Sequence, residues 1–195
     1  MNKNILLCGV GGQGTVLASK LLAAAAMKNG LSVMSAETIG MAQRGGSVVS
    51  HLKLGDTLYT PMLGSKTADL IIGFEPAEAV RMLPYLKDDG WVVASTKPIK
   101  PVTASLSQSY QDEEILAYLK RNVQNLILVD TEKACDSLKS GKVLNMILLG
   151  AALDCGILPI NKQEILSVME EKVHPKFHEL NRKALLYYNE NEVCI

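Results

Sequence analysis

The sequence predicts an α/β protein: a three-layer α/β/α, Rossmann-like domain with a mostly parallel sheet, a β-hairpin insertion and a helical C-terminal end. Three observations support this fold class. Short apolar runs of strand length alternate with helical segments from the N-terminus onward. One stretch near residue 50 alternates between apolar and polar residues, as a hairpin strand does. Beyond Thr131 the pattern is helical throughout.

The first unit of the chain is predicted to be a strand, a helix and a second strand. Residues 4–8 form an apolar run that Gly9 closes, and residues 15–27 are rich in alanine and leucine. Asn29 and Gly30 end this helix, because glycine takes the left-handed conformation at little cost. Residues 31–36 then form the second strand. Such a crossover predicts parallel strands that are covered on both faces.

The next stretch breaks this alternation of strands and helices. Residues 47–54 alternate in polarity, Gly55 and Asp56 follow, and residues 57–60 form another short run. This pattern predicts a β-hairpin whose first strand is exposed to solvent or to a partner on one face.

The rest of the chain supplies three more strands and five helices. A turn is expected at residues 88–90, and the helix at 143–153 is apolar on nearly all sides, which predicts that it is buried. No repeat or linker divides the chain, so we expect one domain over residues 1–195. The strands are expected at 68–73, 91–95 and 126–129, and the helices at 76–83, 112–122, 143–153, 162–172 and 176–188.

Composition excludes several classes of function. The 195 residues include 20 Lys and Arg against 20 Asp and Glu, so the formal net charge is zero. A nucleic-acid binder or a polybasic membrane surface needs an excess of cations. No apolar run approaches the roughly 20 residues of a membrane span, and the N-terminal run is too short for a signal peptide. We therefore expect a cytoplasmic protein.

The four cysteines are Cys8, Cys135, Cys155 and Cys194, and no Cys-x-x-Cys occurs. Iron–sulfur clusters and structural zinc sites usually depend on closely spaced thiolates, so this chain is not expected to hold either.

The sequence Gly-Val-Gly-Gly-Gln-Gly at residues 9–14 follows a predicted strand and opens a helix. Glycines allow a tight turn and a close approach, and free N–H groups at a helix start favour an anion. Glu37 lies 23 residues beyond Gly14, about where a dinucleotide fold has its ribose-binding carboxylate. A tight turn alone would also favour glycine. We expect an anion-, cofactor- or partner-facing loop made of Gly9, Gly11, Gly12, Gln13, Gly14 and Thr15.

A second glycine segment spans residues 36–47 and places Arg44 beside Gly45 and Gly46. A standard dinucleotide fold requires no arginine here. The planar guanidinium offers several donors, and the glycines let neighbouring backbone approach whatever it binds. A charge-assisted hydrogen bond of this kind contributes about 1.5–3 kcal/mol.

Together the two segments resemble the γ-type subunit family of 2-oxoacid:ferredoxin oxidoreductases. The resemblance is carried by the loop at 9–14 and by Glu-Thr-Ile-Gly-Met-Ala-Gln-Arg-Gly-Gly-Ser-Val-Val-Ser-His at 37–51. Met-Ala-Gln-Arg-Gly-Gly at 41–46 is similar to the indolepyruvate branch. The resemblance covers about residues 4–100 by motif and the remainder by length and architecture.

The resemblance implies oxidative decarboxylation of a 2-oxoacid, here an arylpyruvate such as indolepyruvate, to an acyl-CoA, with electrons passing to ferredoxin. Thiamine enzymes hold their metal and diphosphate with a Gly-Asp-Gly segment, which this chain lacks. A larger α subunit is therefore expected to carry thiamine diphosphate, Mg and the iron–sulfur clusters. This chain would hold no cofactor by itself and would be inactive alone. Coenzyme A would be a co-substrate of the complex.

The resemblance also implies that the second glycine segment faces the α subunit. We expect no catalytic residue and no metal ligand in this chain, and Arg44→Ala should leave the fold intact but weaken assembly or use of coenzyme A. The residues expected at the junction are Glu37, Gln43, Arg44, Gly45, Gly46 and Ser47.

Two other functions are compatible with the glycine loop. A stand-alone NAD(P)- or FAD-binding Rossmann oxidoreductase would place Glu37 on a ribose hydroxyl, but it leaves residues 43–46 without a role. A nucleotide-sensing or assembly module would only bind a partner.

The remaining polar residues predict structural roles. His51, on the polar side of its strand, is expected to form a hydrogen bond. His174 and His178 have helical spacing, but Pro175 starts a helix between them, which disfavours a metal pair. The glutamate pairs at 113–114 and 170–171 are expected on solvated helix faces.

Overall fold

The computed structural model describes residues 2–40, 46–99 and 112–191. Its centre is a six-stranded sheet with the order β2-β3-β1-β4-β5-β6. β1 pairs in parallel with β4, β4 with β5 and β5 with β6, whereas β3 is antiparallel to both β1 and β2. The strands are β1 (Lys3–Val10), β2 (Ser32–Ile39), β3 (Ser47–Gly55), β4 (Ala68–Gly73), β5 (Leu86–Ser95) and β6 (Asn125–Val129).

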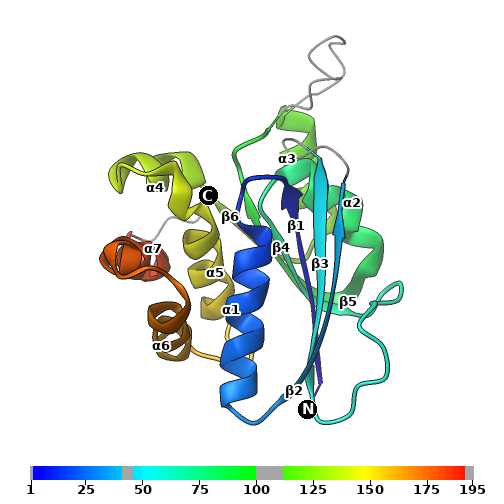
Figure 1. Cartoon of the computed structure of the whole chain (residues 1–195). Helices are drawn as coiled ribbons and strands as arrows, with labels where there is room; N and C mark the ends of the chain where they lie inside the picture. Colours follow the sequence, from blue (N-terminus) through cyan, green and yellow to red (C-terminus); the bar gives the residue numbers. More distant parts are fainter. Residues whose placement is uncertain (1, 41–45, 100–111, 192–195) are drawn as a thin grey trace.

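Helices cover both faces of the sheet, which confirms the predicted three-layer α/β/α architecture (Figure 1). α1 and α5 lie on one face, and α6 and α7 pack outside them, while α2 and α3 lie on the other face. The helices are α1 (Thr15–Lys28), α2 (Pro76–Met82), α3 (Asp112–Asn122), α4 (Thr131–Ser137), α5 (Leu144–Asp154), α6 (Lys162–Lys172) and α7 (His178–Asn191).

The predicted helix boundaries agree closely with the structure. Gly30 ends α1 with a φ of 78°, as its sequence position predicts. α5 is buried along nearly its whole length, because its side chains are apolar on every side. Asn161 caps α6 in a capping box with Glu164.

The predicted hairpin is wrong in its second strand. Residues 57–60 form no strand, and β3 pairs instead with β2, which precedes it, and with β1. β3 therefore lies between β1 and β2, and the crossover through α1 does not join neighbouring strands. The prediction that residues 31–36 are covered on both faces is also wrong, since β2 is an edge strand with mostly exposed residues.

The predicted turn at residues 88–90 is wrong as well. These residues lie within β5, which starts at Leu86. Ala68 pairs with Leu86 and Leu70 pairs with Trp91, so β5 contains extra residues that form a bulge against β4. Polar residues with a glycine are typical of both turns and bulges, and only the pairing partner distinguishes them.

Candidate functional site

The glycine loop connects the end of β1 to the start of α1 at the carboxyl edge of the parallel strands. Gly12 and Gly14 have φ values of 99° and 81°, a left-handed conformation that other residues rarely adopt. Gly14 is the N-cap of α1, and a Cβ there would lie 2.8 Å from Nδ2 of Asn145. The close packing of α5 against the loop therefore requires glycine at this position.

Gln13 is held inside the loop by its side-chain amide. Its Oε1 accepts a hydrogen bond from the N–H of Val10 at 2.7 Å, and its Nε2 donates to the carbonyl of Phe74 at 2.7 Å. A Cβ on Gly9 would lie 2.5 Å from Oε1 of Gln13, so the glycine makes room for the amide. Because Val10 ends β1 and Phe74 follows β4, Gln13 fastens together the carboxyl ends of two neighbouring strands.

The structure brings the two glycine segments into direct contact. The N–H of Gly11 donates to the carbonyl of Gly46 at 2.9 Å, and the N–H of Gly40 donates to the carbonyl of Ser47 at 2.8 Å. The predicted loop and part of the predicted junction thus form one surface, although the N–H groups of Gly11 and Gln13 are already bonded within the protein. Gln43, Arg44 and Gly45 lie outside the described residues.

Behind this surface lie two buried carboxylates that the sequence analysis did not identify. Glu75 is 1% exposed and Glu78 is 6% exposed. Oε2 of Glu78 accepts a hydrogen bond from Ser47 Oγ at 2.7 Å, and Glu75 accepts one from the N–H of Glu78 at 2.8 Å. Ser47 therefore ties the second glycine segment to the N-terminus of α2. Burial raises the pKa of the nearby Cys8 thiol well above its ordinary value, and the charges of Glu78 and Glu75 add to this shift.

Glu37 does not reach the glycine loop. It is exposed on β2, and β3 separates β2 from β1, so two strand spacings, about 10 Å, lie between Glu37 and the end of β1. A ribose-binding carboxylate belongs on the strand next to the loop. This position for Glu37, on which the NAD(P)/FAD interpretation depends, is wrong because the sequence does not show that β3 inserts here.

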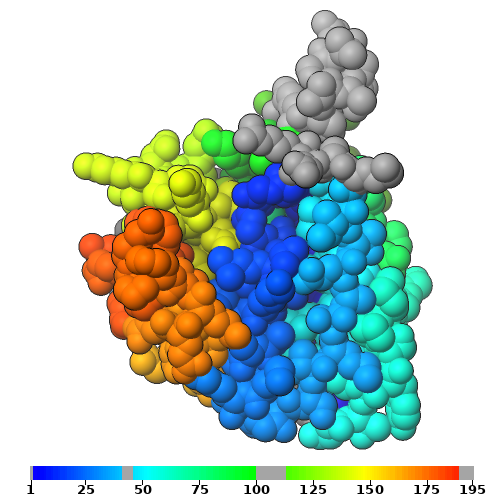
Figure 2. All heavy atoms as spheres, viewed as in Figure 1, coloured from blue at the N-terminus to red at the C-terminus, as the bar shows by residue number. Residues whose placement is uncertain are grey.

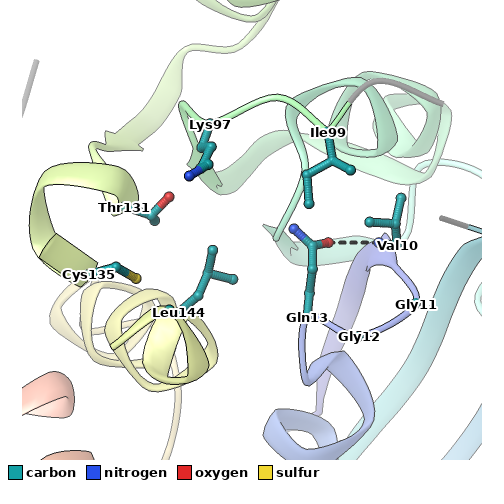
Figure 3. A pocket seen from close by; sticks show the side chains of 10 residues that line it. Val10, Gly11, Gly12, Gln13, Lys97, Ile99, Thr131, Cys135 and Leu144 are labelled. Atoms are coloured by element: carbon teal, nitrogen blue, oxygen red, sulfur yellow. Dashed lines mark hydrogen bonds between the residues drawn. The ribbon is translucent and has the colours of Figure 1, made fainter. Parts of the chain in front are cut away.

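A cavity of about 450 Å³ opens beside the glycine loop (Figure 3). Four connections at the carboxyl edge form its walls: the loop after β1, the segment after β5, the start of α4 and the start of α5. Ligands of open α/β sheets bind at this edge. The lining residues are Val10, Gly11, Gly12, Gln13, Lys97, Ile99, Thr131, Cys135, Gly141 and Leu144.

The cavity provides one cation, one neutral thiol and apolar walls. Nζ of Lys97 donates to Glu132 at 2.8 Å, and this hydrogen bond raises the pKa of Lys97, which stays charged at neutral pH. Burial raises the pKa of the Cys135 thiol, so it is a poor nucleophile. Thr131 Oγ1 is hydrogen-bonded to Ser95 Oγ at 2.6 Å. These groups can bind a ligand, but they form no base–nucleophile pair.

Residues at the carboxyl ends of the strands account for most of what the sequence analysis missed. Glu75 follows β4, Lys97 follows β5 and Thr131 follows β6. The rule that ligands bind at the carboxyl ends of parallel strands would have singled out all three positions.

The described residues do not fit a metal ion or an iron–sulfur cluster. In the parts of the chain that the structure covers, no group of three or more His, Cys, Asp or Glu side chains lies close enough to hold one. The prediction that His51 forms a hydrogen bond is confirmed, since its Nδ1 accepts from the N–H of Leu63 at 3.2 Å, but the side chain is buried and not on a solvated face. Among the same residues, no helix has the length and apolar character needed to cross a membrane.

The glycine loop, the second glycine segment and the cavity lie together at the carboxyl edge of the parallel strands, and the class of protein is an α/β domain built on a partly parallel sheet. Residues 4–187 match the sequence model of the pyruvate ferredoxin/flavodoxin oxidoreductase family, and the chain belongs to this family.

Two relatives that match over more than nine-tenths of their length support the same assignment. The chain is 36% identical to the indolepyruvate oxidoreductase subunit IorB of Archaeoglobus fulgidus, over 97% of this chain and 96% of that one. It is 37% identical to IorB of Pyrococcus horikoshii, over 93% and 91%. The pyruvate oxidoreductase subunit PORC of Thermotoga maritima has the same fold, with a TM-score of 0.69 at 21% identity over 97% and 96% of the two chains.

Proposed function

We propose that this chain is the small subunit of an indolepyruvate, or more generally arylpyruvate, ferredoxin oxidoreductase. The observation that carries the proposal is the identity of 36–37% over more than nine-tenths of each chain with two IorB subunits. The Met-Ala-Gln-Arg-Gly-Gly sequence at residues 41–46 points to the same branch.

The complex would convert a 2-oxoacid anion, coenzyme A and two oxidised ferredoxins into an acyl-CoA, CO2, a proton and two reduced ferredoxins. A larger α subunit would hold thiamine diphosphate, Mg and the clusters, which supply the decarboxylation and the electron relay. This chain would contribute binding and assembly, in agreement with a cavity at the carboxyl edge whose described lining offers a cation and apolar walls and no base–nucleophile pair.

Within this proposal, residues 40–47 and the part of the glycine loop that lines the Lys97 cavity face the α subunit, and the cavity lies at the same junction. The hydrogen bond from Gly11 to Gly46 holds the two segments together. The side chain of Gln13 bonds to Val10 at the end of β1 and to Phe74 after β4, which holds the glycine loop against these two strands. The ammonium of Lys97 and the apolar walls suit a ligand with an anionic group on an apolar chain, which matches the phosphate and pantetheine parts of coenzyme A.

Co-purification from the native host with a tag on this chain tests the subunit role. The expected result is a brown complex with a larger, thiamine-containing chain that reduces ferredoxin with indolepyruvate faster than with pyruvate. A colourless preparation without a larger chain, or micromolar NAD binding by this chain alone, would contradict the proposal.

Two variants of the assembled complex test the junction. Arg44→Ala should keep the melting temperature of the free chain but weaken assembly or raise the KM for coenzyme A. Lys97→Gln should raise the KM for coenzyme A several-fold while kcat and assembly change little. Lys66→Gln is the matched control, because Lys66 also forms an exposed ion pair, with Asp88, away from the carboxyl edge. Unchanged assembly and KM in both variants would remove these residues from the junction.

A further inference from the structure

In the described sheet, β2 is an edge strand with a neighbouring strand on one side only. β2 pairs with β3 in an unbroken register over all eight of its residues, from Ser32 with Gly55 to Ile39 with Val48. The strand contains no proline and no lysine, and no bulge interrupts it. Protected sheet edges usually have at least one of these features. β2 is therefore an open edge rather than a protected one.

The hydrogen bond from Gly40 to Ser47 shows which backbone groups are free. Because the N–H of Gly40 donates to Ser47, these two residues form a hydrogen-bonded pair of the antiparallel ladder. The pattern alternates, so even-numbered residues of β2 turn their N–H and C=O groups toward β3. Val33, Ser35, Glu37 and Ile39 turn theirs toward the open edge.

α1 lies beside this edge, on the same side of the molecule (Figures 1 and 2). The exposed face of α1 includes Leu17 and Met27. Leu17 lies near the carboxyl edge, at the same end as Ile39. Met27 lies near the opposite end, at the same end as Val33. Ile39 is 61% exposed and Met27 is 64% exposed. The surface thus has an apolar group at each end and Lys20 with Glu37 between them.

We propose that a second copy of this chain pairs with β2, antiparallel and about a two-fold axis at Ala36. This register places Ile39 opposite Val33 of the other copy and Glu37 opposite Ser35, so no like charges face each other. Lys20 and Glu37, the exposed charges of the surface, have opposite signs. The two-fold axis also places the Ile39 end of one copy beside the Val33 and Met27 end of the other, so that apolar groups meet at both ends. The two sheets would then form one continuous sheet.

A hollow at the Ile39 end supports the same arrangement. It has a volume of about 340 Å³ and is lined by Val10, Val16 and Val48, with Gly12, Gly14 and Thr15. Val48 pairs with Ile39, so the hollow lies next to the open edge. The second copy would bring its Met27 to this end, and an unbranched thioether is suited to filling an irregular apolar space.

Cross-linking of an Ala36→Cys variant tests the register, both in the full-length chain and in the native complex. Residue 36 would face itself across the axis, within the range of Cα separations that a disulfide spans. Mild oxidation should therefore link two copies of this chain. Ser35→Cys is the matched control, because residue 35 would face residue 37, and the two copies of residue 35 would be diagonal neighbours about 8 Å apart, beyond the span of a disulfide.

Association of the free chain gives an independent readout by sedimentation. Ile39→Lys should weaken self-association at least tenfold, whereas Tyr118→Lys, an equal change on the exposed face of α3, should not. An Ala36→Cys chain that stays uncrosslinked, or that cross-links to a larger subunit instead, would overturn the proposal, as would equal self-association of the Ile39→Lys and wild-type chains. None of these readouts depends on the colour, cofactors or substrate of the complex, so they do not depend on the proposed function.

Discussion

The parallel strands β1, β4, β5 and β6 and the edge strand β2 belong to one sheet but differ in their relation to solvent, and β3, between β1 and β2, is largely buried. β4 is buried along nearly its whole length, whereas most residues of β2 are exposed. Helices cover the parallel strands on both faces, as they must when strands are joined by crossover helices. The parallel strands and β3 therefore belong to the buried core, whereas β2 provides exposed surface.

Phe74→Ala and Ile39→Ala test this division most strongly. Phe74 is fully buried directly after β4, so its truncation should lower the free energy of unfolding by about 3–5 kcal/mol. Ile39 at the end of β2 is exposed, and its truncation should cost less than about 0.5 kcal/mol in the monomer. Urea unfolding at low protein concentration measures both. Equal losses would show that the edge strand β2 is part of the same stabilising core.

The same division explains which parts of the fold the sequence predicts. Residues 68–73 form a strand at the predicted bounds, because an apolar run between polar residues can only be buried. The alternation of apolar and polar residues at 47–54 predicts a strand but does not show which strands it pairs with. In the structure this strand, β3, lies between β1 and β2, because it pairs with residues far from it in the sequence. Gly55 and Asp56 end β3 without reversing the chain into a new strand.

The site is predictable in its local parts only. The glycine loop and its turn follow from six consecutive residues. Its contact with Gly46 depends on strand order, which no local pattern contains. Gln13 is a further example, since its partner Phe74 is 61 residues away.

Gln13→Ala tests the connection between β1 and β4. The substitution removes both hydrogen bonds of the amide and leaves the Val10 N–H and the Phe74 carbonyl without this partner. The expected loss is about 2–4 kcal/mol, because each such group costs about 1–3 kcal/mol. Gln124→Ala, at an exposed glutamine, is the control and should be neutral. A loss below about 0.5 kcal/mol in the free energy of unfolding would show that the two hydrogen bonds of the amide contribute little to stability.

Ser47→Ala tests the connection between the antiparallel pair and α2. Ser47 Oγ donates to the buried carboxylate of Glu78, which keeps its ion pair with Arg81 at 3.2 Å. A smaller loss, about 1–2 kcal/mol, is therefore expected in the same unfolding measurement. Ser32→Ala, on the exposed part of β2, is the matched control. If Ser47→Ala and Ser32→Ala lower the free energy of unfolding equally, the hydrogen bond from Ser47 to Glu78 does not stabilise the contact between β3 and α2.

His51 gives the smallest effect and the only one that depends on pH. Burial lowers the pKa of this histidine below its ordinary value of 6.5, and Lys53 adds to the shift. The neutral ring accepts the hydrogen bond from Leu63, which a doubly protonated ring cannot do. The unfolded chain therefore binds more protons than the folded chain once the pH falls to about 6.5.

The sign of the effect follows directly from this difference. The free energy of unfolding should decrease as the pH falls below about 6.5, and the decrease should stop once the pH is below the lowered pKa of the folded state. His51→Asn offers an amide oxygen to the Leu63 N–H and does not titrate, so it should reduce this slope between pH 7.5 and 5.5. Urea unfolding across this range measures the slope. If the variant keeps the full wild-type slope, another group is responsible, and β3 is not the pH-sensitive part of the sheet.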